Sequence, residues 1–114
     1  MVHTVVETPA YLAAAADAGM TDDEVTAAVD LIAANPSAGD IMQGAGGCRK
    51  VRVAGKGRGK SGGYLVITYY AAMDFPVFLL TVFSKGDRAS LSKGERNALG
   101  VVAKRLTDSL RGRG

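Results

Sequence analysis

A basic, glycine-rich segment in the middle of the chain holds the residues best suited to chemistry. Between Arg49 and Lys60 the sequence has six positive charges and no acidic residue. Its glycines allow the backbone to approach a ligand closely and expose N–H donors. Cations neutralise phosphate, and aromatic rings such as those of Tyr64, Tyr69 and Tyr70 stack on unpaired bases. The segment therefore predicts a surface that binds RNA.

Other kinds of site fit the sequence poorly. The segment Gly57–Ser61 ends in Gly-Lys-Ser like a phosphate-binding P-loop, but Ala54 stands where that motif needs its first glycine, and no helix follows. With one histidine, His3, and one cysteine, Cys48, the chain offers no zinc site and no Ser-His-Asp arrangement. We expect no metal and no cofactor. Acid–base chemistry would depend on Lys, Arg and Tyr: the cations can stabilise the charge of a reacting phosphodiester, and a Tyr or Lys can move a proton.

The charge is divided unevenly along the chain. All 14 Lys and Arg residues follow residue 48, whereas seven of the 11 acidic residues precede it, so the two parts carry formal charges of about −7 and +10. Such a split indicates a polyanion-binding half and an acidic flank, although a solvated basic face is the simpler alternative. The 114 residues suit a single domain, 1–114. Without an apolar run of membrane-spanning length or a signal-like N-terminus, we expect a cytoplasmic protein that does not enter a membrane.

The N-terminal part predicts a strand and two helices. Residues 2–8 are rich in β-branched side chains and predict a strand. Thr8-Pro9 can begin a helix that ends at Gly19. Thr21 and Glu24 form a capping box for a second helix, which Asn35-Pro36 ends. We expect a loop over residues 37–47.

The rest of the chain predicts three strands and a helix. Residues 48–54 alternate, with Val51 and Val53 on one face and Lys50 and Arg52 on the other. Two apolar runs, 64–70 and 77–83, complete an antiparallel meander. A capping box at Ser92–Glu95 begins the last helix, whose apolar stripe we expect to pack on the sheet; it comprises Leu99, Val102, Ala103, Leu106 and Leu110. The order β-α-α-β-β-β-α predicts an α+β fold, with helices packed on a mainly antiparallel sheet.

Three segments resemble the RelE/HigB-like toxins of bacterial type II toxin–antitoxin systems, which belong to the RelE/ParE superfamily. GAGGCRKVR from Gly44 to Arg52 resembles their GTGGLRKLR segment. GRGKSGG from Gly57 to Gly63, followed by a strand ending in two tyrosines, resembles GKGKSGG…YYY. LLTVFSKGDRASL from Leu79 to Leu91 resembles their apolar strand, lysine and charged turn before the last helix. The resemblance runs from about Gly39 to the last helix, which is about two-thirds of the chain.

The resemblance implies a RelE-like fold and a metal-independent endoribonuclease. Such toxins cleave messenger RNA in the ribosomal A site, where the ribose 2′-OH attacks the adjacent phosphate, and so inhibit translation. A cognate antitoxin would be encoded beside the toxin, and we expect it to be HigA-like with a helix-turn-helix. The ribosome and mRNA would be the other partners.

The resemblance also implies roles for individual residues. Lys50 and Arg52 match paired basic positions and would bind phosphate or transfer a proton, while Lys85 and Arg88 would stabilise the charge of the transition state. Tyr64 completes the catalytic set. The residues expected to bind RNA are Arg49, Lys56, Arg58, Lys60 and Tyr70.

Three departures from the family pattern leave the proton-transfer group open. Tyr64 stands where many relatives have arginine, Gly86 stands where some have another arginine, and Leu91-Ser92 provides no tyrosine. Tyr64, Tyr69 and Tyr70 are alternatives for proton transfer, but a place in the core is at least as consistent with Tyr69 and Tyr70. The alternative functions are a ParE-like poison of DNA gyrase and a non-catalytic nucleic-acid-binding member of the family. The dense basic segment favours the ribonuclease.

Overall fold

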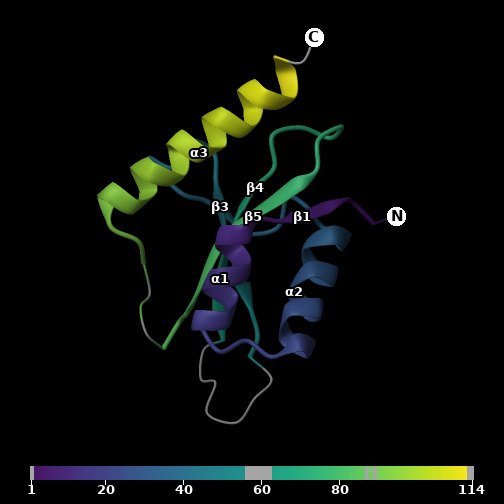
Figure 1. Cartoon of the computed structure of the whole chain (residues 1–114), viewed down its shortest axis with the longest axis vertical. Helices are drawn as coiled ribbons and strands as arrows, with labels where there is room; N and C mark the ends of the chain where they lie inside the picture. Colours follow the sequence, from purple (N-terminus) through teal and green to yellow (C-terminus); the bar gives the residue numbers. More distant parts are fainter. Residues whose placement is uncertain (1, 56–62, 87, 89, 113–114) are drawn as a thin grey trace.

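A five-stranded sheet forms the centre of the molecule in the computed structural model, which describes residues 2–55, 63–86, 88 and 90–112 (Figure 1). The strands lie in the order β1-β5-β4-β3-β2. Their bounds are Val5–Glu7 for β1, Asp40–Ile41 for β2, Arg49–Val53 for β3, Tyr64–Tyr69 for β4 and Val77–Ser84 for β5. All neighbouring strands are antiparallel except β1, which pairs with β5 in parallel. The predicted α+β fold with a mainly antiparallel sheet is thus confirmed.

Two helices cover one face of the sheet, and their ends follow the predicted caps. Helix α1 (Pro9–Asp17) begins after Thr8, whose hydroxyl accepts from the Tyr11 N–H. Helix α2 (Asp22–Ala34) begins with the predicted capping box: Thr21 and Glu24 each accept from the backbone N–H of the other. In Figure 1, α1 lies in front of the strands and α2 lies to one side of it. They cover a core that includes Tyr11, Ala28, Ile32, Val51, Val53, Tyr64, Val66, Val77 and Leu79.

Helix α3 (Lys93–Arg111) packs on the other face, over a smaller core. Its capping box also forms as predicted, between Ser92 and Glu95. The core beneath it includes Cys48, Ile67, Leu80 and Ala103. Within the described part of the chain, no helix is both long and apolar enough to cross a membrane.

Three sequence-based expectations need correction. The segment 37–47, predicted to be a loop, contains the short strand β2, which pairs with β3. The apolar stripe of the last helix is only partly covered, because Ala103 is its one buried residue and Val102 is 41% exposed. The first strand is also shorter than the predicted 2–8.

Candidate active site

The register of the central strands places Lys50 and Arg52 on the face of the sheet that α3 partly covers. Val51 and Val53 are buried against α1 and α2, so alternation turns Lys50 and Arg52 to the opposite face, as predicted. Their partners on β4 are Ile67 and Leu65, respectively. Lys50 is half-buried and Arg52 is exposed. Among the described residues, neither side chain has an ion-pair partner.

A row of paired residues joins Arg52 to a second arginine. Arg52 pairs with Leu65, which in turn pairs with Phe83 on β5. The Arg88 guanidinium lies over the Phe83 ring, 5.2 Å from its centre. With neighbouring strands about 4.8 Å apart, the row spans about 10 Å from β3 to β5. The two arginines therefore lie at opposite ends of one row on the same face.

Arg88 is held in place by the start of α3. Its guanidinium donates to both carboxylate oxygens of Glu95, forming an ion pair, and also to the Ser90 carbonyl. The hydrogen bonds from Arg88 and from the Ser92 backbone lower the pKa of Glu95 to about 2, and the same contact raises the pKa of Arg88. Arg88 therefore lies at the candidate site with its positive charge partly neutralised by Glu95.

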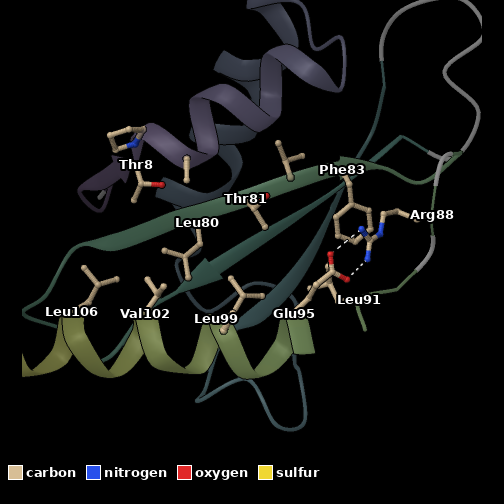
Figure 2. Close-up of a pocket in the computed structure, with 14 residues that line it drawn as sticks. Thr8, Leu80, Thr81, Phe83, Arg88, Leu91, Glu95, Leu99, Val102 and Leu106 are labelled. Carbon is tan, nitrogen blue, oxygen red and sulfur yellow. Dashed lines mark hydrogen bonds and ion pairs between the residues drawn. The ribbon is translucent and has the colours of Figure 1, made fainter. Parts of the chain in front are cut away.

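An apolar groove separates α3 from β5 beside this pair. Its volume is about 510 Å³, and Leu80, Leu99, Val102 and Leu106 contribute to its walls. Figure 2 shows Leu80 on β5 and Leu99 on α3 facing one another, with Arg88 and Glu95 beside Phe83 at one end and Thr8 toward the other. Because this groove lies between α3 and β5, the apolar stripe predicted for α3 is not fully buried.

Tyr64 lies in the core, which argues against the catalytic role predicted for it. It pairs with Val53 and therefore faces α1 and α2, away from Lys50 and Arg52. The side chain is fully buried, and its hydroxyl donates to Oε1 of Glu24 at 3.0 Å. A phenol in this place cannot reach RNA on the opposite face without leaving the core.

Tyr70 and Arg49 are also separated from the cationic pair, whereas Tyr69 belongs to the core under α3, on the same face as Lys50. The Tyr69 and Thr107 hydroxyls are hydrogen-bonded, which links β4 to α3. Tyr70 packs against the core of α1 and α2, where its ring meets the His3 ring edge-on at 5.0 Å. Alternation along β3 turns Arg49 to the face opposite Lys50. The structure thus does not gather the predicted RNA-binding residues Arg49 and Tyr70 beside Lys50.

The remaining predicted residues fall in two groups. Lys85 follows β5 directly, is half-buried, and its backbone N–H donates to the Gly63 carbonyl at 3.0 Å. Lys56, Arg58 and Lys60 lie outside the described residues. The cationic set that the structure describes on the α3 side of the sheet therefore comprises Lys50, Arg52 and Arg88, with Lys85 at the end of β5.

One cation beside Lys50 was not predicted from the sequence. Arg96, in the first turns of α3, lines a polar pocket together with Lys50. Its guanidinium donates to the Leu91 carbonyl at 2.9 Å. Helical spacing identifies Arg96 only as part of the polar face of α3, because no local pattern reveals which strand that face approaches.

Comparison with protein families agrees with this arrangement. Residues 5–111 match the model of a family described as the RelE toxin of the RelE/RelB toxin–antitoxin system. The match spans all eight helices and strands of the described structure, from the beginning of β1 to the end of α3. The chain therefore belongs to the RelE family of toxins, which act with an antitoxin partner.

Proposed function

We propose that this toxin is a HigB-like, ribosome-dependent endoribonuclease that cleaves messenger RNA in the A site and so inhibits translation. The observation that carries the proposal is the position of Lys50 and Arg52, two cations without an ion-pair partner among the described residues, on the face of the sheet that α3 only partly covers. The acidic first turn of α2, with Asp22, Asp23 and Glu24, belongs to a helix on the other face. An RNA strand on the Lys50 face thus avoids those acids.

In the proposed reaction the RNA itself supplies both the attacking oxygen and the leaving oxygen. The ribose 2′-oxygen forms a bond to the adjacent phosphorus, and the bond from phosphorus to the 5′-oxygen breaks. The 2′-hydroxyl gives its proton to a base, the departing 5′-oxygen gains one, and the products are a 2′,3′-cyclic phosphate and a 5′-hydroxyl. Lys50 and Arg52 stabilise the negative charge of the pentavalent intermediate, and Arg88 contributes from the other end of the row.

Proton transfer requires a side chain that can both lose and gain a proton. Arginine does not do this in proteins, and Tyr64 is buried on the other face. Lys50 and Lys85 are the described residues of the cationic set with suitable chemistry. We assign proton transfer to this pair of lysines in place of Tyr64.

Replacing Lys50 and Arg52 together with glutamine tests the proposal. Removing one group that stabilises transition-state charge typically costs about 10²–10³ in rate, so the double variant should lose cleavage and toxicity with its fold intact. The protein is expressed in bacteria without its antitoxin, and new 5′-hydroxyl ends on messenger RNA are mapped. Cuts confined to translated frames are expected for the unaltered chain.

A matched variant controls for the loss of charge. Lys93 and Arg105 are exposed cations on α3 that line none of the hollows described here, and replacing both with glutamine should leave the cuts unchanged. Growth arrest without cuts would contradict the ribonuclease and direct attention to gyrase. Undiminished cleavage by the Lys50/Arg52 double variant would show that the active site lies elsewhere.

A further inference from the structure

A polar pocket lies between the edge of the sheet and the beginning of α3. Its volume is about 350 Å³, within the range of small-molecule sites. It shares only Leu91 with the apolar groove of Figure 2. The lining residues are Asp40, Ile41, Met42, Gln43, Lys50, Ser90, Leu91 and Arg96. Most of its charged and amide groups come from segments that the proposed reaction does not use.

Strand pairing and a helix start bring the charged groups of this pocket together. Asp40 on β2 pairs with Lys50 on β3, and directly paired residues of antiparallel strands point to the same face. Arg96 is contributed by α3. Its hydrogen bond to the Leu91 carbonyl holds the guanidinium beside the pocket. Lys50 and Arg96 are both half-buried. Neither has an ion-pair partner among the residues that the structure describes.

This combination of groups fits a nucleotide better than it fits a simple anion. Two cations attract phosphate, but the Asp40 carboxylate repels it. The base of a nucleotide supplies N–H donors that a carboxylate can accept, and guanine presents donors on neighbouring atoms of its pairing edge. The Gln43 amide can both donate and accept. A nucleotide with its phosphate toward Lys50 and Arg96 would satisfy the cations and the carboxylate together.

We propose that this pocket binds an unpaired nucleotide of the RNA, with Lys50 and Arg96 on its phosphate and Asp40 on the donors of its base. The inference rests on the proposed ribonuclease, because Lys50 then links the pocket to the phosphate that is cleaved. Arg96 is a substrate-positioning residue under this proposal. Asp40 gives the site a preference for guanine.

Binding of an RNA that cannot be cut tests the pocket without requiring cleavage. A fluorescent tetranucleotide containing guanine, with every 2′-hydroxyl methylated, is titrated with the purified full-length protein at several salt concentrations. Each phosphate contact with a single strand contributes about 0.7 to the slope of log affinity against log salt. Arg96→Gln should weaken binding and lower this slope by about 0.7, while Arg96→Lys should retain the slope because the charge remains.

Arg105→Gln is the matched control, since it removes an exposed charge from the same helix away from the pocket. It should leave both affinity and slope unchanged. Equal behaviour of Arg96→Gln and Arg105→Gln would overturn the proposal. Loss of the slope in Arg96→Lys as well would show that Arg96 acts only through its bond to Leu91.

Competition separates a nucleotide site from a phosphate site. Guanosine 5′-monophosphate should displace the probe at concentrations where inorganic phosphate does not, and Asp40→Asn should reduce that difference. Equal competition by inorganic phosphate would overturn the assignment of the base. Normal cutting of messenger RNA together with unchanged probe binding by Arg96→Gln would refute the pocket proposal alone. Absence of cuts together with loss of probe binding by Arg96→Gln would refute the ribonuclease proposal alone.

Discussion

Glu24 is a fully buried carboxylate that joins two parts of the molecule. One of its oxygens accepts from the Thr21 N–H at 2.9 Å, which closes the capping box of α2, and from the Tyr64 hydroxyl at 3.0 Å. A carboxylate without such donors would be costly to bury. The capping residue therefore also ties α2 to the first residue of β4.

Replacing Tyr64 with phenylalanine should destabilise the fold without affecting catalysis. The change removes a hydrogen bond to a buried charged group, which typically contributes about 1.5–3 kcal/mol to stability. Urea unfolding should show this loss, whereas messenger RNA cleavage per folded molecule should equal that of the unaltered chain. Tyr70→Phe is the control, because its hydroxyl has no hydrogen-bond partner among the described residues. A Tyr64→Phe variant with full stability and no cleavage would restore Tyr64 to the catalytic set.

The sequence was sufficient to predict some site residues but not others. The alternation of side chains within one strand predicts that Lys50 and Arg52 share a face of the sheet, because Val51 and Val53 are apolar and must be buried on the other face. The face of Tyr64 depends on the register between β3 and β4, which no local pattern reveals. The sequence could therefore identify the cationic pair but could not separate it from the buried tyrosine.

Helix α3 is attached to the rest of the molecule along one side. In its middle, the thiol of Cys48 donates to the Leu99 carbonyl at 3.9 Å. Gly46, with φ of +66°, lies against Gly100 so closely that an added Cβ would be 2.8 Å from the Gly100 Cα. Toward the C-terminus the bond between Tyr69 and Thr107 adds a further contact. The other side of the helix faces the apolar groove, so α3 covers only part of the sheet (Figure 2).

The start of α3 should weaken in acid. Because the folded state lowers the pKa of Glu95 from 4.5 to about 2, its stabilising effect is complete above about pH 4.5 and is lost as the pH falls toward 2. Thermal unfolding measured across this range should show Glu95→Gln less stable than the unaltered chain at pH 6, with the difference shrinking toward pH 2. Asp108→Asn breaks the exposed pair with Lys104 and should have little effect. A difference that does not vary with pH would refute the assignment.

At the scale of the whole molecule, the sheet separates the acidic start of α2 from the cations of the candidate site. The acidic first turn of α2 belongs to one face, while Lys50, Arg52 and Arg96 lie on the side of α3. The order of elements and the antiparallel meander were predictable, because each has a local hydrophobic or capping signal. The parallel pairing of β1 with β5 and the existence of β2 were not, because strands of three and two residues carry too little pattern to identify a partner.

We predict that an acidic segment of the antitoxin covers the cationic face in the inactive complex. Opposite charges across an interface strengthen binding in a salt-dependent manner. The dissociation constant of the toxin–antitoxin complex should therefore rise between low and high salt, and the Lys50/Arg52 double variant should show a smaller rise. The Lys93/Arg105 double variant serves as the control. An affinity that does not change with salt would argue against the prediction.

The pairing of β1 with β5 has a consequence for how the protein is made. Strand β1 leaves the ribosome before the other strands and must wait for Val77–Leu79, its partners on the last strand in the chain order. The Thr8 hydroxyl likewise donates to the Leu79 carbonyl, so the start of α1 gains that contact only when β5 arrives. Contacts between residues so distant in sequence slow folding. A nascent chain thus cannot complete the sheet until most of it has been synthesised, which leaves an interval in which a toxin is present only as an unfinished fold.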